Sequence, residues 1–336
     1  MLTLKTYAFK RKFLKFIYSI LFIVSFSLSS EDFYRLGLGS CHDQDMEIPA
    51  WESLKKENLD SFFFLGDNVY GDIPSGELGR LINAYDTFKQ NKPQWFNEVE
   101  IFTIWDDHDY GINDGGKNWK YKNIAKKLFL DFFSVDNDDV RFKREGIYHS
   151  KDFELFNKKI KIVSLDTRFF KDDFTFNKDR SLNKKYIIDY DKNKTILGKE
   201  QWQWLSNELN KKYNLFILLS SFQVLSTSHG WEKWNNFYYE RNKLLKLLNQ
   251  NSLSIILSGD RHFAGIYNYK NIYEITASSF NQKTFNIIEN DNLRVGELIG
   301  KNNFGIIKLD ESNIEIKIVA SEGTTKEVLN SIKLKY

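Results

Sequence analysis

The sequence predicts an α/β domain, and two observations carry that prediction. Short apolar runs rich in Ile, Val, Leu and Phe alternate along the chain with longer segments of helical character. Continuous apolar runs of this kind are typical of strands buried on both faces, and their alternation with helices is typical of α/β folds. The length of 336 residues allows one large domain or two small ones.

Six strands and four helices are expected. The strands are predicted at 32–40, 61–66, 100–105, 159–165, 214–221 and 253–259. The helices are predicted at 76–90, 118–133, 200–212 and 232–249. Near the end of the chain, FNIIE, NFGIIKL, NIEIKIVA and VLNSIKLK follow one another closely with turn residues between them. Such spacing predicts an antiparallel finish to a sheet.

Residues 1–29 are predicted to be a signal peptide. A basic head is formed by Lys5, Lys10, Arg11, Lys12 and Lys15, and the apolar run FIYSILFIVSFSLSS follows it. A basic head, a short apolar run and small residues at its exit are typical of secretory signals. The alternative is an uncleaved membrane anchor, although the run is shorter than the ~20 residues of a typical span. We therefore expect residues 30–336 to be exported, to a periplasmic, extracellular or other secretory location, with no stable membrane span.

Export changes the interpretation of the charge. The chain has a formal net charge of +3, and loss of the five basic residues of the signal leaves −2. The mature surface therefore gives no reason to expect nucleic-acid binding. The single cysteine, Cys41, excludes an internal disulfide, so it is either a buried thiol or a metal ligand.

Polar and chargeable side chains follow five of the predicted strands. These strand-end segments are Cys41-His42-Asp43, Asp67-Asn68-Val69-Tyr70-Gly71-Asp72, TIWDDHDYGINDGG at 103–116, Asp166-Thr167-Arg168 and Asp260-Arg261-His262. One Asp after a strand is usually a turn residue or a helix cap. Five such ends are better explained by a ligand site, because ligands of α/β sheets bind at the carboxyl ends of the strands.

The crowded carboxylates predict a cation. Like charges within a few ångströms oppose each other's ionisation, whereas a metal ion holds them ionised. Carboxylates alone suit calcium, magnesium or manganese, and an added thiolate, phenolate or imidazole suits a transition metal such as iron. The residue types thus predict a metal centre with mixed ligands.

These motifs resemble a known family. GSC at 39–41, GDNVYGD at 66–72, WDDHDYGIND at 105–114, SLDTR at 164–168 and SGDRH at 258–262 resemble, in order and spacing, the motifs of PhoD-like secreted alkaline phosphatases. That family belongs to the calcineurin-like metallophosphoesterases. The resemblance extends from about residue 33 to about 290. It implies a four-layer α/β/β/α sandwich of two mixed sheets over residues 30–336, iron and calcium as cofactors, and a small phosphate ester as substrate.

The resemblance also implies roles for individual residues. Cys41 matches an iron ligand and Asp67 a carboxylate that bridges two metals. Asp107, Asp260 and His262 match further ligands, and Asp114 with Asn113 is expected to contact metal or phosphate. For the tyrosine ligand, two candidates remain, Tyr70 and the slightly favoured Tyr85. His108 is expected to protonate the leaving group, and Arg168 either binds phosphate or forms a salt bridge with a neighbour such as Asp166 or Asp172.

The expected reaction is hydrolysis of a phosphate ester by a metal-activated hydroxide, with Asn113 and Arg168 holding phosphoryl oxygens. The family resemblance leaves monoesters and diesters open, including a phospholipase-type diesterase. A competing class is a non-catalytic, secreted calcium-binding module on the same fold. The segment HGWEKWNNFYYE at 229–240 is expected to be a packing helix, with a wall of the substrate cleft as its second interpretation.

Overall fold

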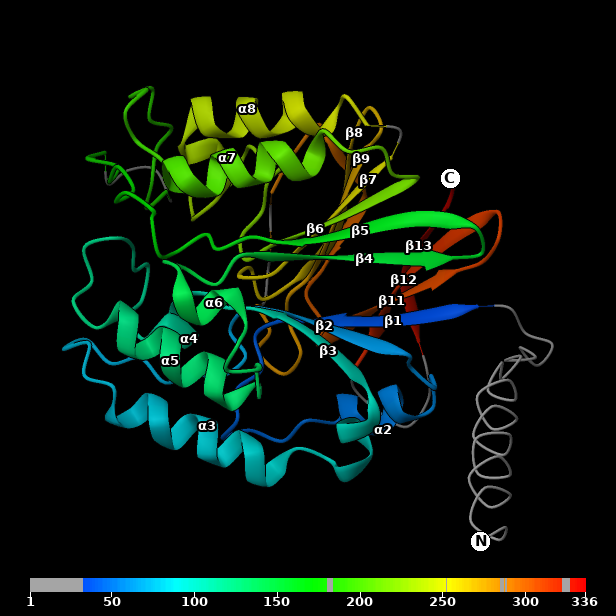
Figure 1. The fold of residues 1–336 in the computed structure, drawn as a ribbon, viewed down its shortest axis with the longest axis horizontal. Helices are drawn as coiled ribbons and strands as arrows, with labels where there is room; N and C mark the ends of the chain where they lie inside the picture. The colour runs from blue at the N-terminus through cyan, green and yellow to red at the C-terminus, as the bar shows by residue number, and fades with distance from the viewer. Residues whose placement is uncertain (1–32, 180–183, 252, 285–286, 288, 322–326) are drawn as a thin grey trace, which may run out of the picture. The chain divides into compact units, whose positions relative to one another are not determined.

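Two mixed β-sheets pack against each other at the centre of the computed structural model, and helices cover their outer faces (Figure 1). The structure describes residues 33–179, 184–251, 253–284, 287, 289–321 and 327–336. The predicted signal peptide lies outside these residues. The predicted four-layer α/β/β/α architecture is confirmed.

The first sheet has six strands in the order β13-β12-β11-β1-β2-β3. Their bounds are β1 (Tyr34–Gly39), β2 (Ser61–Leu65), β3 (Glu100–Ile104), β11 (Asn303–Leu309), β12 (Asn313–Ala320) and β13 (Val328–Lys335). β1, β2 and β3 are parallel, and β11 runs antiparallel to β1 with Tyr34 opposite Leu309. The last three strands form the predicted antiparallel finish.

The second sheet has seven strands in the order β10-β8-β9-β7-β6-β5-β4. Their bounds are β4 (His149–Leu155), β5 (Lys158–Ser164), β6 (Leu215–Ser220), β7 (Ser254–Ser258), β8 (Ala264–Tyr269), β9 (Ile272–Ala277) and β10 (Arg294–Ile299). β5, β6, β7 and β9 are parallel, so their carboxyl ends meet at one edge of the sheet.

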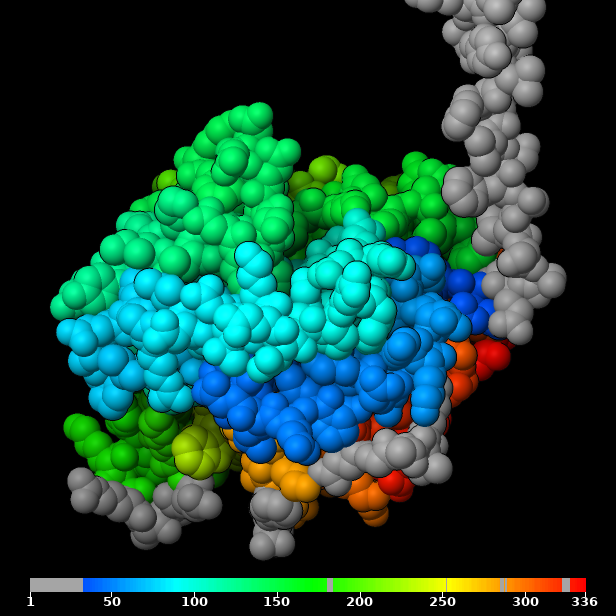
Figure 2. Space-filling model, turned by 90° about the horizontal axis from the view of Figure 1, so that it is seen from below, coloured from blue at the N-terminus to red at the C-terminus, as the bar shows by residue number. Residues whose placement is uncertain are grey.

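Helices form the two outer layers. Their bounds are α2 (Ala50–Lys55), α3 (Gly79–Asn91), η1 (Gln94–Glu98), α4 (Asp107–Tyr110), α5 (Lys122–Phe132), α6 (Val140–Lys143), α7 (Gly198–Leu209), η2 (Trp234–Asn236) and α8 (Tyr238–Leu248). α2, α3 and α5 pack on the outer face of the first sheet, and α7 and α8 on that of the second. Figure 2 shows the face formed largely by the blue-to-cyan segment that contains α2 and α3.

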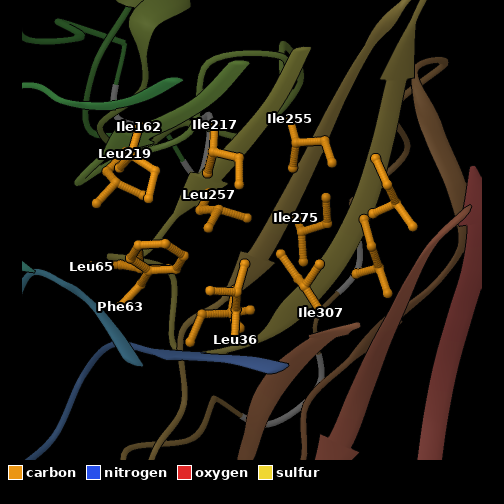
Figure 3. Packing of buried hydrophobic residues seen from close by; sticks show 14 of the residues in the cluster. Leu36, Phe63, Leu65, Ile162, Ile217, Leu219, Ile255, Leu257, Ile275 and Ile307 are labelled. Carbon is orange, nitrogen blue, oxygen red and sulfur yellow. The ribbon is translucent and has the colours of Figure 1, made fainter. Parts of the chain in front are cut away.

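The main core lies between the two sheets. Phe63 and Leu65 of β2 point into it from one sheet, and Ile217 and Leu219 of β6 point into it from the other (Figure 3). Alternate residues of the same strands, such as Phe64, pack on the outer helices instead. Burial on both faces explains why these strands are almost wholly apolar.

The six predicted strands and four predicted helices are all found, with bounds that differ by a few residues. The helix expected at 232–249 is divided into η2 and α8. FNIIE lies partly outside the described residues, and β4, β8, β9 and β10 were not predicted. In the part of the chain that the structure describes, none of the helices has both the length and the apolar character needed to cross a membrane.

Candidate metal centre

The predicted strand-end residues meet at one edge of the two sheets, around a cavity of about 680 Å³. The predicted site residues that line this cavity are Asp67, Asp107, His108, Asn113, Asp114, Asp260 and His262. Cys41 follows β1 and is fully buried. The topology explains the convergence, because β1, β2 and β3 are parallel neighbours in one sheet and β5, β6 and β7 are parallel neighbours in the other.

The side chains fall into three groups whose ligand atoms lie within 4.8 Å of one another. The groups are Cys41, Asp67 and His262; Asp67, Asp107 and His108; and Asp107, Asp114 and Glu232. Asp67 belongs to the first two groups and Asp107 to the last two. The arrangement therefore offers adjacent positions for cations that share carboxylate ligands.

Cys41 has the surroundings of a ligand rather than of a core residue. Its Sγ lies 3.3 Å from the hydroxyl oxygens of both Ser40 and Ser278, and the thiol donates to Oδ2 of Asp67 at 3.5 Å. Burial raises the pKa of the thiol to about 11. The thiolate therefore requires a nearby positive charge, which a metal ion provides.

Asp67 is buried with an unused ligand atom. Its Oδ1 has no hydrogen-bond partner among the described residues. Burial raises the pKa of Asp67 well above its usual value, and the charges of Cys41, Asp106 and Asp107 raise it further. A buried, unpartnered carboxylate oxygen is unfavourable, and a cation between the ligand groups would satisfy it. The residues present thus fit a metal.

Five of the predicted ligands have left-handed backbone conformations. The φ angles are 59° at Cys41, 49° at Asp67, 57° at Asp114, 72° at Asp260 and 55° at His262. This region is uncommon for residues other than glycine, and such residues cluster at functional sites. Four of the five, all except Asp114, lie in the turns that follow strands, so the backbone changes direction sharply at these residues predicted to be ligands.

Asp109 and Gly66 lock two of the motifs together. Asp109 accepts hydrogen bonds from the backbone N–H groups of Asn68 at 2.9 Å, Val69 at 3.2 Å and Asp106 at 3.0 Å. Gly66 has a φ of 95°, and a Cβ at this position would lie 2.6 Å from Cβ of Asp106. The turn carrying Asp67 therefore packs directly on the turn that leads to Asp107. Nothing in the sequence distinguishes Asp109 from its acidic neighbours.

His108 is held by a carboxylate. Its Nδ1 lies 2.5 Å from Oδ1 of Asp72, and its ring lies 4.3 Å from the ring of Tyr70. Burial alone would lower the pKa of His108, but the charges of Asp107 and Asp67 and the hydrogen bond to Asp72 raise it well above its usual value. These carboxylates therefore favour the protonated form of the imidazole.

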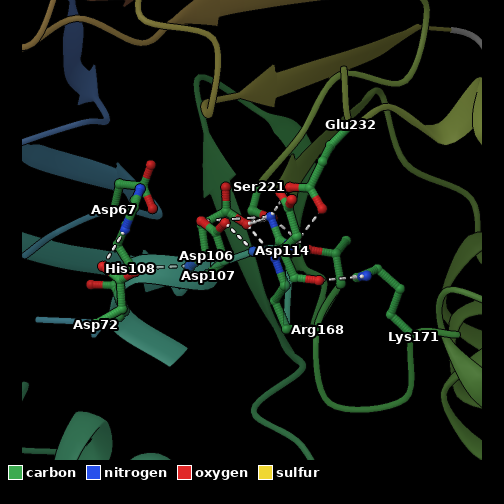
Figure 4. A network of polar contacts seen from close by, with 12 residues as sticks. Asp67, Asp72, Asp106, Asp107, His108, Asp114, Arg168, Lys171, Ser221 and Glu232 are labelled. Atoms are coloured by element: carbon green, nitrogen blue, oxygen red, sulfur yellow. Dashed lines mark hydrogen bonds and ion pairs between the residues drawn. The ribbon is translucent and has the colours of Figure 1, made fainter. Parts of the chain in front are cut away.

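Arg168 has a different environment from the one expected of a phosphate ligand. It is fully buried, with Nε donating to Asp106 at 2.5 Å and two nitrogens donating to Glu232 at 2.9 and 2.6 Å (Figure 4). The guanidinium is thus engaged with two carboxylates and does not line the cavity, which gives no support to the predicted phosphate contact. The alternative of a salt bridge holds, but its partners are Asp106 and Glu232 rather than Asp166 or Asp172.

Asp114 and Asn113 lie on the outer wall of the cavity. Oδ2 of Asp114 accepts from the hydroxyl of Tyr186 at 2.5 Å and contacts the ammonium of Lys185. The backbone N–H of Asp114 donates to Oδ2 of Asp107 at 2.7 Å. Asn113 is exposed and lines the cavity, so its amide is available to a bound molecule.

The two candidate tyrosines lie in different places. Tyr70 Oη shares a hydrogen bond of 3.0 Å with Nε2 of His262, a member of the first ligand group. Tyr85 instead packs among the apolar residues between α3 and the sheet, with its ring centroid 4.6 Å from that of Phe132. The structure does not bring Tyr85 to the ligand groups, so the geometry favours Tyr70 over the slightly preferred Tyr85.

Two mixed sheets with acids, a cysteine and a histidine at their shared strand ends define the metallophosphoesterase class of fold. Within that class, a family model described as PhoD-like phosphatase matches residues 83–294. The chain belongs to the PhoD-like phosphatase family.

Similar proteins agree with this family. Alkaline phosphatase D of Bacillus subtilis (strain 168) is 22% identical over 274 residues, which are 68% of this chain and 46% of that protein. The chain thus spans about half the length of this curated relative. A solved structure of PhoD has a TM-score of 0.68 at 16% identity, and the match covers 91% of this chain and 70% of that chain.

Two further solved structures share the fold. A purple acid phosphatase from yellow lupin (Lupinus luteus) seeds has a TM-score of 0.62 at 13% identity, covering 90% of this chain and 54% of that chain. GAP50, described as the anchor in the inner membrane complex of Plasmodium, has a TM-score of 0.60 at 15% identity, covering 91% of this chain and 89% of that chain. At these identities the likeness shows the fold alone.

Proposed function

We propose that this chain is an exported, metal-dependent hydrolase of phosphate esters. The observation that carries the proposal is the position of Asp67, whose carboxylate belongs to two ligand groups at once. A carboxylate shared in this way suits a pair of metal ions, an arrangement that many phosphoesterases use. Membership of the PhoD-like phosphatase family supports the same function.

Iron and calcium are the proposed metals. Cys41, Asp67 and His262, with Tyr70 beside them, offer sulfur, nitrogen and phenol ligands that suit iron. Asp107, Asp114 and Glu232 offer only carboxylate oxygens, which suit calcium. Asp260 lines the same cavity and is proposed as a further ligand. Its pKa is raised well above the usual value by burial.

The side chains of the cavity would divide the work of hydrolysis. Bound metal ions supply charge neutralisation for the phosphoryl group and a nucleophile from water. Because Asp72 engages Nδ1 of His108, Nε2 is the nitrogen left to give a proton to the departing oxygen. The exposed amide of Asn113 would donate to a phosphoryl oxygen. Arg168 would act indirectly, by holding Asp106 and Glu232 in place.

The proposal is tested by comparing two esters on the metal-loaded protein. His108→Ala should reduce kcat on an alkyl phosphate by roughly 10²–10⁴-fold and on 4-nitrophenyl phosphate by much less, because nitrophenolate needs little protonation. Metal content should be unchanged. His149→Ala, which removes a histidine of β4 outside the cavity lining, is the control. If the wild-type protein hydrolysed neither monoesters nor diesters, the proposed enzymatic function would be refuted.

The iron assignment has its own test. A phenolate bound to ferric iron gives a visible charge-transfer band, which Tyr70→Phe should abolish and Tyr85→Phe should leave. A band that survives Tyr70→Phe would remove Tyr70 from the ligand set. Elemental analysis that finds no transition metal in the purified protein would remove iron as well.

The competing function is a calcium-binding module without catalysis. Cys41 and His108 argue against it, because a calcium-only site uses oxygen ligands and has no need of a thiol or an imidazole beside Asp67. Assays of the metal-loaded wild-type protein on monoesters, diesters and phospholipids decide which of these esters it prefers.

Export is proposed from residues 1–29, which lie outside the described part of the chain. The basic head and apolar run of that segment support it. N-terminal sequencing of protein recovered from outside the cytoplasm should begin near residue 30. Cytosolic protein that still begins at Met1 would contradict export.

A further inference from the structure

One exposed tryptophan stands out at the cavity. Trp231 is 45% exposed, whereas the residues on both sides of it, His229, Gly230, Glu232 and Lys233, are buried. A large aromatic side chain is costly to leave in water, and within a buried segment it has the most to gain from a bound partner. The exposure of this indole therefore calls for an explanation that the metal centre does not give.

The backbone around Trp231 is held from several directions. The next residue, Glu232, accepts two hydrogen bonds from Arg168 at 2.9 and 2.6 Å. The carbonyl of Gly230 accepts from the N–H of Tyr186 at 2.8 Å, and the N–H of Trp231 donates to Nδ1 of His229 at 3.2 Å. The indole thus projects from a fixed segment, so little conformational entropy is lost when it contacts a ligand.

Apolar side chains from three segments line the same cavity as the ligand groups. Trp231 precedes η2, Phe263 follows the turn after β7, and Ile287 follows β9. The cavity of about 680 Å³ also contains Asp67 and His108, so it has room for an organic group as well as a phosphate. A molecule whose phosphate lies at the ligand groups would present its organic part to this apolar lining.

We infer that Trp231, supported by Phe263 and Ile287, forms a subsite that selects phosphate esters whose alcohol part carries a flat aromatic ring. The inference rests on the proposed function and names the substrate class of that site. A flat ring gains most from an indole, since offset stacking adds to the burial of apolar area. An ester with only a small alkyl group would fill the metal end of the cavity and leave Trp231 in water.

The test uses binding rather than turnover. Isothermal titration of the metal-loaded protein compares phenylphosphonate with methylphosphonate, which share the charged group and differ in the ring. Wild-type protein should bind phenylphosphonate more tightly by at least the factor of about 2–12 that one stacked ring contributes. Trp231→Ala should abolish this preference, and Trp231→Phe should retain much of it.

Tyr238→Ala is the matched control, because Tyr238 is an exposed aromatic residue outside the cavity lining. It should leave both dissociation constants unchanged. Equal weakening of both phosphonates by Trp231→Ala, no preference in the wild type, or no binding of either compound would overturn the subsite. A phenyl preference in a protein that hydrolyses no ester would refute the proposed function and leave the subsite standing.

Discussion

Burial has opposite effects in two regions, the apolar layer between the two sheets and the polar edge at their strand ends. The same strands form both regions. β2 places Phe63 in the apolar layer, and the turn after it places Asp67 at the edge. In the layer every neighbour is apolar, so burial stabilises the fold. At the edge, buried carboxylates face a thiol and one another, so burial raises the pKa of Asp67 and Asp260. The comparison teaches that the layer is stable by itself, whereas the edge needs added positive charge.

Within the edge, the acids differ in what compensates them. Arg168 is paired with Asp106 and Glu232, so a cation of the chain itself balances these two carboxylates. Asp67 instead accepts from the thiol of Cys41. Asp106 and Glu232 are therefore held by a cation of the chain itself, although Glu232 also belongs to the third ligand group, whereas Asp67 has only a neutral thiol as its side-chain partner.

The largest expected effect comes from Asp67→Asn, which keeps the shape of the shared ligand and removes its charge. Activity should fall by at least roughly 10³-fold, at or above the upper range for loss of one transition-state hydrogen bond. Elemental analysis should show loss of metal from both ligand groups, while the metal-free protein remains folded. Asp131→Asn, at an exposed acid on α5, is the control. Retention of both metals would show that Asp67 is not shared.

Arg168→Met separates a structural cation from a substrate ligand. The change leaves Asp106 and Glu232 buried without their partner, so the free energy of unfolding should fall by about 3–5 kcal/mol. Lys185→Met removes a less buried cation that contacts Asp114 and should cost less than about 1 kcal/mol. Denaturant titration measures both. A rise in KM with unchanged stability in Arg168→Met would restore the phosphate role.

The folding stability of the metal-free protein should depend on pH because of the buried carboxylates at the edge. Burial raises the pKa of the proposed ligands Asp67 and Asp260 well above the usual value of a carboxyl group. Above about pH 4 the folded state therefore holds protons that the unfolded chain has released, so stability falls as pH rises. Thermal unfolding of chelator-treated protein should give a higher Tm at pH 5 than at pH 8. Metal-loaded protein should lose this trend, and a metal-free protein more stable at pH 8 would contradict the account.

The smallest effect is expected in the layer. Ile217→Val removes one methylene from β6 and should lower the free energy of unfolding by about 0.5–1.5 kcal/mol. Metal content and activity of the folded protein should not change, because packing in the layer is independent of the ligand groups at the edge. Loss of metal from folded Ile217→Val would show that the two regions are coupled.

The sequence predicted the strands that have two buried faces better than the others. LFILLS of β6 is apolar throughout and was easily found. β4, with the sequence HSKDFEL, lies at the edge of its sheet and has no fully buried residue, so its charged side chains concealed it. The hydrophobic pattern of a strand reflects how much of it is buried. An edge strand is buried too little for its pattern to be distinctive.

The convergence of Asp67 and Asp107 at the cavity was predictable because each follows a strand in a recognisable motif. Glu232 was missed because its role depends on Arg168, a partner far along the chain that only the packing of the second sheet brings near. Tyr85, in the helix that follows the motif, was slightly favoured because it could match the tyrosine that the resemblance to PhoD-like enzymes implies. The sequence of a helix does not state which way a side chain points, and Tyr85 points into the apolar cluster between α3 and the first sheet.

The pairing of β1 with β11 has a consequence for how the protein is made. Tyr34 of β1 lies opposite Leu309 of β11, and Sγ of Cys41 contacts the hydroxyl of Ser278. A chain synthesised from its N-terminus therefore carries β1 and its cysteine long before their partners exist. We expect ribosome-bound fragments that end before β11 to leave the first sheet incomplete and to retain no metal. Metal loading would then be a late event that reports completion of the whole domain.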